Sequence, residues 1–311
     1  MRVLVLGAGS IGRRHHQNLQ ALGAEAGLMP WRAFDPARAD EVLAGLDALV
    51  IATATPIREE IVALCAERGI AFYVEKPLAY RSETLASILR RAAPVAERSV
   101  AGFMMRYHPA FRHLADDDLS DTFRFGFEIG HDVTQWRQDW RFSESYAAQA
   151  EGGGVLLDLC HEIDMAACLF PGLATDGVSS LGHAAYPGVD MASQVALTAA
   201  GRATGTGAMD YLAPVSTRRI ALRGLDRLHD FDLIAGRYRI AGRGARDLDL
   251  PFERNEMFLA LMRDFLALVA GKAPSDNPHL PRLDRVGDSC ALIARAWESR
   301  RFVGTIAKDI P

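Results

Sequence analysis

The sequence predicts an α/β protein in two parts: a doubly wound parallel sheet, followed by an α/β domain with a large, open, mainly antiparallel sheet. Three observations lead to this prediction. Short apolar runs alternate with helical stretches in roughly the first third of the chain. A glycine-rich turn, Gly7 to Gly12, follows the first apolar run. Beyond about residue 120, apolar residues recur instead at every second position.

The first part of the chain alternates strands and helices. Residues 2–6 are apolar, rich in β-branched side chains and closed by glycine, which is typical of a buried parallel strand. Residues 11–22 have helical spacing, and Gly23 ends that helix. Pro30 weakens the second predicted strand, 27–34, because proline lacks the N–H that a strand needs. Further strands are predicted at 46–52, 70–74 and 99–104, and further helices at 57–68 and 82–93.

The second part of the chain predicts an antiparallel meander. Phe123, Phe125, Phe127 and Ile129 alternate with polar or small residues, as on a strand with one buried face. The change of period divides the chain into a first domain, 1–117, and a second domain, 118–311, whose terminal helices are free to pack back on the first. The other predicted elements are strands at 193–198, 203–209, 218–223 and 238–240 and helices at 154–169, 254–269 and 283–299.

Composition narrows the class of protein. With 311 residues, 49% of them hydrophobic and 24% charged, the chain has material for two buried cores. A net charge of -4 argues against nucleic-acid or membrane partners. The apolar run 3–6 is too short for a signal peptide, and no stretch reaches the ~18 apolar residues of a membrane helix. The four cysteines (Cys65, Cys160, Cys168 and Cys290) lack paired or metal-binding spacing. We therefore expect a cytoplasmic location and no metal site.

The motif Gly7-x-Gly9-x-x-Gly12 stands between the first strand and the first helix. The first glycine allows a tight turn, the second lets the backbone approach a pyrophosphate, and the third lets the helix pack closely on the sheet. The start of the helix offers unpaired N–H groups to the anion. A glycine-rich turn without a ligand is the alternative, but the strand–turn–helix context favours an NAD(P)-binding Rossmann domain over 1–117.

The residues after the second strand bear on the choice of cofactor. Domains that prefer NAD place an acidic residue about 20 positions beyond the glycines, on the ribose 2′-hydroxyl. This chain has Arg32 there, and no acid until Asp35. Arginine suits a 2′-phosphate, and the missing carboxylate removes a repulsion. We expect NADP to be preferred; NAD is the alternative, with Arg32 as a solvated residue and Asp35 as the acid.

Four segments carry a family resemblance: GAGSIGRRHHQNLQALG (7–23), EKPLA (75–79), GGGVLLDLCHEID (152–164) and ERNEMF (253–258). In this order and spacing, over nearly the whole chain, they resemble the glucose-fructose oxidoreductase / inositol dehydrogenase / rhizopine-catabolism (Gfo/Idh/MocA) superfamily. The resemblance implies hydride transfer between nicotinamide and a carbinol or keto carbon of a sugar, nucleotide sugar, cyclitol or related polyol. It also implies a homodimer or homotetramer joined through the open sheet.

The resemblance assigns roles to individual residues. Lys76 would hold the reacting hydroxyl and stabilise alkoxide charge, and the family often has a cis bond at the following proline. His161 would be the general acid/base, with Asp158 as its partner or as a substrate ligand. Three residues apart on one predicted helix, the two would share a face, whereas Glu162 and Asp164 are expected to cap or solvate that helix. Cofactor contacts are implied for Gly7, Gly9, Ser10, Ile11, Gly12, Thr53, Thr55, Pro56, Glu75 and Lys76.

Two more segments are candidates for substrate binding. Arg106-Tyr107, which leaves the last parallel strand, resembles a substrate-facing turn of the family. A polar segment with two tryptophans and two arginines precedes the helix of Asp158; aromatic rings stack on sugars, and arginines bind phosphates or carboxylates. A role at the domain interface is the alternative for this segment, which consists of Trp136, Arg137, Trp140 and Arg141.

One loop departs from the family pattern, and two other functions remain open. After Thr55-Pro56 the family usually carries a histidine near the nicotinamide ribose, but this chain continues Ile57-Arg58 and is shorter by about two residues. The cofactor contact of this loop is therefore left open. The other functions are a glycosidase that uses NAD through transient oxidation, and a catalytically silent regulator that senses the cofactor. Retention of lysine, aspartate and histidine together argues against the regulator.

Overall fold

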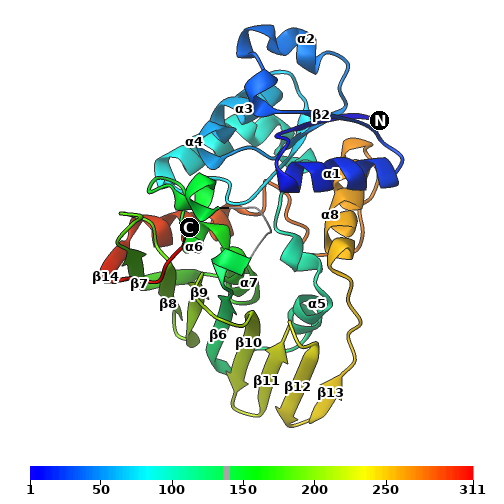
Figure 1. Ribbon diagram of the computed structural model, residues 1–311. Coiled ribbons are helices and arrows are strands. Elements are labelled where there is room, and N and C mark those ends of the chain that lie inside the picture. Colours follow the sequence, from blue (N-terminus) through cyan, green and yellow to red (C-terminus); the bar gives the residue numbers. More distant parts are fainter. Residues whose placement is uncertain (136–140, 311) are drawn as a thin grey trace. The chain divides into compact units, whose positions relative to one another are not determined.

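The structure is a computed structural model that describes residues 1–135 and 141–310 (Figure 1). The chain divides into two compact units. The first unit comprises Met1–Tyr107 and Glu253–Cys290, and the second comprises His108–Phe252 and Ala291–Pro311. The division at the C-terminal end falls within helix α9, Gly287–Glu298. Among the described residues, no helix is both long enough and apolar enough to cross a membrane.

The first unit is built on a parallel sheet with the order β2-β1-β3-β4-β5 in the described part of the chain. All of its strand pairs are parallel, which confirms the doubly wound sheet that the sequence predicted. Its strands are β1 (Arg2–Leu6), β2 (Glu25–Met29), β3 (Ala48–Ile51), β4 (Ala71–Val74) and β5 (Val100–Ala101). Its helices are α1 (Ser10–Ala21), α2 (Ala39–Leu43), α3 (Arg58–Glu67), α4 (Ser82–Ala92) and α8 (Arg254–Val269).

Two predicted strands of this unit are shorter or shifted. The second strand lies at 25–29 rather than 27–34, because the chain turns at Pro30 into a short 3-10 helix, Trp31–Ala33. The strand predicted at 99–104 pairs only over Val100–Ala101, and Met104–Tyr107 forms a 3-10 turn. Both strands end earlier than predicted, and β2 also begins two residues earlier.

The second unit is built on a large sheet with the order β13-β12-β11-β10-β6-β9-β8-β7-β14 in the described residues. Its pairs are antiparallel apart from β6–β9 and β7–β14, as predicted for a mainly antiparallel sheet. Its strands are β6 (Thr122–Gly130), β7 (Leu173–His183), β8 (Ala192–Ala199), β9 (Ala203–Asp210), β10 (Thr217–Gly224), β11 (Arg227–Asp232), β12 (Arg237–Gly242), β13 (Arg246–Leu248) and β14 (Arg300–Ile306).

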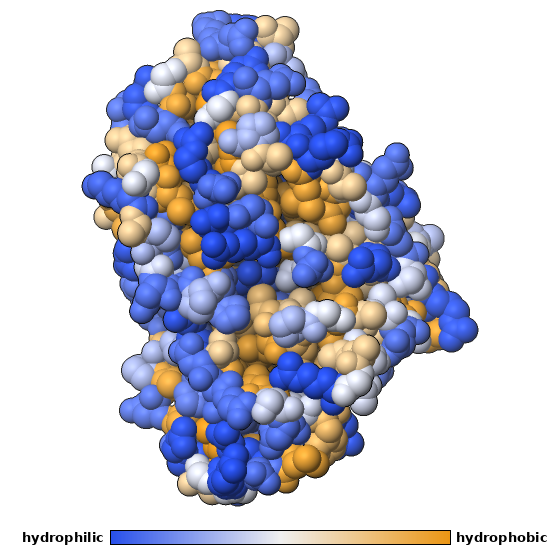
Figure 2. Space-filling view, turned by 180° about the vertical axis from the view of Figure 1, so that it is seen from behind, coloured by the Kyte–Doolittle hydropathy of each residue, from blue (hydrophilic) through white to orange (hydrophobic). Residues whose placement is uncertain are grey.

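The large sheet buries one face and exposes alternate side chains on the other. Phe125 and Phe127 of β6 are buried, whereas Arg124 and Glu128 on either side of them in the chain are exposed. The helices of this unit are α5 (Pro109–Asp116), α6 (Val155–Asp158) and α7 (His161–Leu169). Helices α6 and α7 pack on β6, β8 and β9. Seen from behind, the lower half of the molecule shows apolar surface interrupted by polar groups (Figure 2).

Candidate active site

The glycine turn, residues 7–12, joins β1 to α1 as the sequence predicted. Gly7 has φ +115°, and a Cβ on it would lie 2.3 Å from the carbonyl oxygen of Ala52. A Cβ on Gly12 would lie 1.8 Å from the carbonyl oxygen of Gly7. Gly9 differs, because nothing lies within 4 Å of the place its Cβ would take. Gly7 and Gly12 thus permit close packing, whereas Gly9 leaves space above the turn.

The start of α1 is suited to an anion. Gly9 is its N-cap, and within the described residues no side chain caps the first N–H groups or places an acid in the first turn. Ser10 and Ile11 begin the helix there. Such a helix start, next to an open glycine, has the geometry that binds a pyrophosphate. The residues present therefore fit the diphosphate of a dinucleotide.

The end of β3 supplies a second part of the same edge. The order β2-β1-β3 makes the carboxyl ends of β1 and β3 the point where the sheet reverses direction, which is where doubly wound sheets bind ligands. Thr53 follows β3, and its hydroxyl is buried with no hydrogen-bond partner among the described residues. Thr55 and Pro56 form a 3-10 turn, Thr55–Ile57, before α3. A buried hydroxyl without a partner in the chain is available to bind a group from outside it, such as a water or a ligand.

The turn after β4, residues 75–77, is held from inside the first unit. The carboxylate Oε1 of Glu75 lies 2.7 Å from Nε2 of His15, and the N–H of Lys76 donates to Oε2 of Glu75 at 3.2 Å. Burial by itself raises the pKa of Glu75, but the hydrogen bond and charge of His15, followed by the charges of Lys76 and Arg58, lower it overall. Glu75 therefore stays ionised. The Lys76–Pro77 bond is cis, as the family resemblance implied.

Arg58 is a buried residue whose role the sequence did not reveal. It begins α3 and is only 5% exposed. Its Nε and Nη2 donate to the carbonyl oxygen of Thr53 at 3.2 and 2.8 Å. Its Nη1 donates to the carbonyl oxygens of Glu75, at 2.5 Å, and of Pro77. The guanidinium thus joins the loop after β3 to the turn after β4.

At the end of β2 the structure gives Arg32 and Asp35 different surroundings. Arg32 is exposed on the 3-10 turn Trp31–Ala33. The Asp35 carboxylate accepts a hydrogen bond from the N–H of Ala37 at 3.0 Å and so caps the next short helix. The ring of Trp31 stacks on Phe34, with centroids 5.5 Å apart. Arg32 has the exposure that a phosphate-binding residue needs.

Arg106 and Tyr107 are engaged inside the first unit. Arg106 is 3% exposed, and its guanidinium donates to the carbonyl oxygen of His279 at 3.3 Å and to Oγ of Ser289 at 3.1 Å. The hydroxyl of Tyr107 donates to Oδ2 of Asp264 at 2.5 Å. These bonds favour a structural role for both side chains. Their contact with substrate stays a prediction.

In the second unit, Asp158 and His161 lie on two successive helices rather than on one. Helix α6 ends at Asp158, Leu159 leaves helical geometry with φ -107° and ψ 29°, and α7 begins at His161. The prediction of one continuous helix over 154–169, with the two residues three apart on one face, is therefore wrong. Both side chains are nevertheless buried, at 6% exposure each.

Two tyrosines that the sequence did not single out bind the Asp158 carboxylate. Tyr146 donates to Oδ1 at 2.5 Å, and Tyr211 donates to Oδ2 at 2.9 Å. Burial, and then the charge of Asp158, raise the pKa of Tyr211 well above its ordinary value, so this phenol keeps its proton. Burial lowers the pKa of the neighbouring His131, although Asp158 and other carboxylates oppose the shift. The carboxylate of Asp158 is thus fixed by one phenol on each oxygen.

Asp190 and Glu162 support these helices from within the second unit. Asp190 accepts from the N–H of Val155 with its carbonyl and from the N–H of Leu156 with its carboxylate, both at 2.9 Å, and so fixes the start of α6. Glu162 was expected to cap or solvate its helix, as was Asp164, but it is 1% exposed and pairs with Arg218 of β10 at 2.7 Å. Asp164 is fully buried in the first turn of α7. The expectation that these carboxylates are solvated was wrong, since both are buried; for Glu162 the reason is that the covered face of the sheet offers the cation of Arg218.

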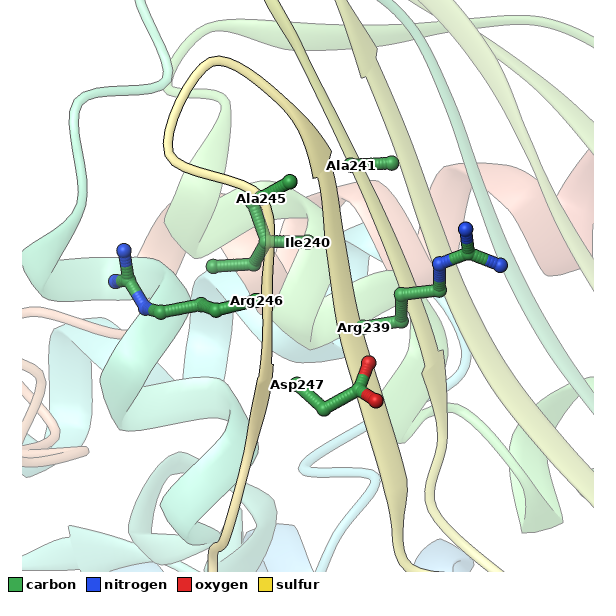
Figure 3. Close-up of a pocket in the computed structure, with 6 residues that line it drawn as sticks. All are labelled: Arg239, Ile240, Ala241, Ala245, Arg246 and Asp247. Carbon is green, nitrogen blue, oxygen red and sulfur yellow. The ribbon is translucent and has the colours of Figure 1, made fainter.

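Other predicted residues lie away from these groups or outside the described residues. Trp136, Arg137 and Trp140 lie outside them, and Arg141 is exposed just before the turn Phe142–Glu144. A shallow pocket of about 320 Å³ lies between β12 and β13, at the opposite edge of the large sheet from β14. Figure 3 shows the guanidinium groups of Arg239 and Arg246 pointing away from each other there. This pocket contains none of the predicted site residues.

Sequence comparisons identify relatives of the chain. Residues 112–226 match the model of a protein family described as GFO/IDH/MocA C-terminal domain. Inositol 2-dehydrogenase of Mycolicibacterium smegmatis is 29% identical over 40% of this chain and 41% of that protein. UDP-N-acetylglucosamine 3-dehydrogenase of Acidithiobacillus ferrooxidans is 23% identical over 88% of this chain and 90% of that protein. The chain thus aligns with less than half of the first relative and with most of the second.

Solved structures share the fold of both units. The structure of the UDP-N-acetylglucosamine 3-dehydrogenase matches with a TM-score of 0.76 and 21% identity, over 97% of this chain and 96% of that one. A 3-ketoreductase from Actinomadura kijaniata, in complex with NADP and TDP-benzene, matches with a TM-score of 0.78 and 17% identity, over 98% and 99%. The resemblance that the four sequence segments carried is confirmed: residues 112–226 match the C-terminal domain of the Gfo/Idh/MocA family, and the chain is similar in sequence to an inositol 2-dehydrogenase and a UDP-N-acetylglucosamine 3-dehydrogenase.

Proposed function

We propose that the protein is an NADP(H)-dependent dehydrogenase or reductase that transfers hydride to or from a carbinol or keto carbon of a nucleotide sugar or related polyol. The observation that carries the proposal is the glycine turn at the reversal point of the parallel sheet, with the lysine turn 75–77 on the neighbouring edge. The relatives support the class: they are named as a cyclitol dehydrogenase, a nucleotide-sugar dehydrogenase and a 3-ketoreductase.

In this proposal the chain's own residues bind, orient and move a proton. Gly9, Ser10 and Ile11 hold the diphosphate through backbone N–H groups. The cofactor, when bound, supplies or accepts the hydride. The ammonium of Lys76 stabilises negative charge on the reacting oxygen, and His161 takes or returns the proton. Asp158, held by two phenols, orients the reacting group or the histidine.

We favour NADP over NAD because of the residues after β2. Arg32 is exposed, and the Asp35 carboxylate is already used as a helix cap. An exposed guanidinium binds a 2′-phosphate as a bidentate, charge-assisted partner. The structure of the A. kijaniata relative contains NADP, whereas that of a levoglucosan dehydrogenase, a further match to the fold, contains NADH. Proteins of this fold therefore bind either cofactor, and Arg32 is the residue of this chain that favours NADP.

Cytoplasmic location and homo-oligomerisation remain part of the proposal. The outer surface of the large sheet and its loops carries exposed apolar side chains, among them Leu225, Phe302 and Val303. Burying such side chains against a second copy is a common way to cover an open sheet. The proposal is therefore a dimer or tetramer joined through this sheet.

The test is a substrate panel with a matched pair of lysine variants. NADPH consumption is measured with oxidised nucleotide sugars, and NADP+ reduction with UDP-N-acetylglucosamine, inositol and levoglucosan. We expect turnover with at least one compound, and a fall in kcat of about 10²–10⁴-fold in Lys76→Ala, because a positioned ionisable group contributes about that much. Lys272→Ala, on an exposed lysine, is the control and keeps wild-type turnover.

The other functions appear as different outcomes of the same panel. If the protein binds NADPH but no compound of the panel is oxidised or reduced, the result favours a cofactor-sensing regulator over an enzyme. Release of a free sugar from a glycoside without net change in nicotinamide absorbance would indicate a glycosidase acting by transient oxidation. Wild-type kcat in Lys76→Ala would remove Lys76 from the chemistry.

A further inference from the structure

Arg58 makes an unusual set of contacts for an arginine. It stands at the first position of α3 and turns its guanidinium inward, where it is 5% exposed. Arginine is rarely buried so fully unless its charge is compensated. Here backbone carbonyl groups of residues 53, 75 and 77 provide that compensation, and the charge of Arg58 also lowers the pKa of the buried Glu75.

The three carbonyl groups come from two loops that matter for the proposed reaction. The carbonyl of Thr53 belongs to the loop after β3, next to the unpaired Thr53 hydroxyl. The carbonyls of Glu75 and Pro77 belong to the turn after β4 and stand on either side of Lys76 in the chain. The peptide N–H of Lys76 is held in addition by the Glu75 carboxylate. The backbone is thus held at the peptide group between residues 75 and 76, directly before Lys76, and again at the peptide group between residues 77 and 78.

We propose that Arg58 is a positioning residue for Lys76, and that it couples the lysine turn to the cofactor loop after β3. This inference rests on the proposed function, since it assigns Arg58 to the same reaction. Arg58 does not touch the reacting atoms in this account. It acts by fixing the direction in which Lys76 leaves the backbone.

The geometry of the guanidinium explains why arginine is needed. Its Nε and Nη2 bind one carbonyl, while its Nη1 binds two others. A planar group with five donors spans both loops at once, whereas the ammonium of lysine is a single point with three donors. A lysine at position 58 keeps the buried charge but loses contact with one loop. The neutral glutamine loses the charge as well.

The chain's lysine content provides a direct readout that needs no substrate. Only three lysines occur in the sequence: Lys76, Lys272 and Lys308. Lys272 is exposed, and Lys308 pairs with Asp132 at 2.7 Å. Protein labelled with ¹³C at lysine Cε therefore gives three lysine signals in a ¹H–¹³C spectrum, and Lys76→Ala identifies the signal of interest. The signal of Lys308, which is held in an ion pair, reports whether a variant is folded, and that of Lys272 marks the position of an exposed lysine.

The variants are Arg58→Gln, Arg58→Lys and a matched control, Arg68→Gln. Arg68 lies just after the C-terminal end of the same helix and donates to the carbonyl oxygen of Leu64 at 2.9 Å, but it contacts neither loop in the described residues. We expect Arg58→Gln to move the Lys76 signal more than halfway towards that of exposed Lys272, Arg58→Lys to move it less, and Arg68→Gln to leave it in place. A wild-type position of the Lys76 signal in folded Arg58→Gln overturns the proposal. If Arg58→Gln does not fold, an unmoved Lys76 signal in Arg58→Lys overturns it.

Measurements of kcat and KM distinguish a misplaced Lys76 from a general loss of structure in the Arg58 variants. A misplaced catalytic group costs up to about 10²-fold in rate, so we expect kcat of Arg58→Lys to fall at least tenfold, with KM for NADPH changed less than threefold. When Lys76 is already replaced by alanine, Arg58→Lys should lower kcat by less than threefold further, because both substitutions then remove the same contribution of Lys76. Additive losses overturn the proposal. Wild-type kcat in Lys76→Ala overturns only the catalytic role that the proposed function gives to Lys76, while the lysine signal still decides the positioning.

Discussion

Replacing Gly9 with alanine should separate cofactor binding from folding. In the folded chain nothing lies within 4 Å of the place a Cβ would take, and φ -71° with ψ -176° suits any residue. Alanine is a poorer helix N-cap than glycine, but it also reduces the freedom of the unfolded chain by about 0.4–1 kcal/mol. These effects oppose each other. We expect the free energy of unfolding to change by less than about 1 kcal/mol.

The same methyl group occupies the space through which a pyrophosphate would approach the first N–H groups of α1. Displacing the anion far enough to lose one charged hydrogen bond removes about 1.5–3 kcal/mol of binding free energy. That corresponds to about a 10- to 150-fold rise in the NADPH dissociation constant. Fluorescence titration with NADPH measures the constant, and chemical denaturation of the same sample measures stability.

Gly12→Ala is the matched control for this prediction. Its Cβ would lie 1.8 Å from the carbonyl oxygen of Gly7, so the backbone must move, at a cost of about 1–3 kcal/mol or more. Gly9→Ala should therefore bind NADPH more weakly at nearly unchanged free energy of unfolding, whereas Gly12→Ala should lower the free energy of unfolding. Wild-type NADPH affinity in Gly9→Ala would refute the placement of the diphosphate. A loss of stability equal to that of Gly12→Ala would refute the view that the space above Gly9 is open.

The remaining predictions concern pH and cofactor choice. Burial, and then the charge of Arg218, lower the pKa of His108 from 6.5 to about 4, so the unfolded chain binds a proton that the folded chain does not. The free energy of unfolding should therefore fall by about 3 kcal/mol as pH drops from 6.5 to 4. His108→Asn keeps the hydrogen bond to the N–H of Ala110 and should reduce that loss when denaturation is measured at several pH values. The same dependence of the free energy of unfolding on pH in this variant would contradict the assignment to His108. Arg32→Ala should raise the NADPH dissociation constant at least tenfold and leave that of NADH within threefold; equal effects on both would exclude a 2′-phosphate contact.

The strand–helix alternation of the first part of the chain and the period-two pattern of the second predicted most of the fold. Features that depend on exposure or on tertiary contacts were missed. Buried strands such as β3 and β4 were found because all their residues are apolar. Strand β14 was not predicted, because all its central residues are exposed at the edge of the large sheet and no alternating pattern marks them. The break at Leu159 also has no sequence signal, since the segment DLCHEID contains neither glycine nor proline. Strand β14 and the helix break at Leu159 depend on exposure and tertiary contacts, which a local sequence pattern does not reveal.

Some parts of the candidate site could likewise be predicted from the sequence, and others could not. The glycine turn and the lysine turn 75–77 were predictable, because each is a contiguous motif at the end of a strand. The two tyrosines on Asp158 were not, because Tyr146 lies 12 and Tyr211 lies 53 residues away in the chain. Glu162 was misjudged for a related reason, since its partner Arg218 is 56 residues away. The residues that fix the Asp158 and Glu162 carboxylates come from distant parts of the chain, so no spacing rule identifies them.

Arg58 shows how a departure from a family pattern acquires meaning in three dimensions. In the sequence, the loop after Thr55-Pro56 was notable only for lacking the family's histidine and for being shorter. In the structure, the start of α3 lies next to the carbonyl groups that follow β3 and β4, and these buried groups need donors. A guanidinium at the first helical position reaches all three from one side chain. The departure from the family pattern at this loop therefore coincides with a bridge between the two loops, and Arg58→Lys tests whether that bridge needs a guanidinium.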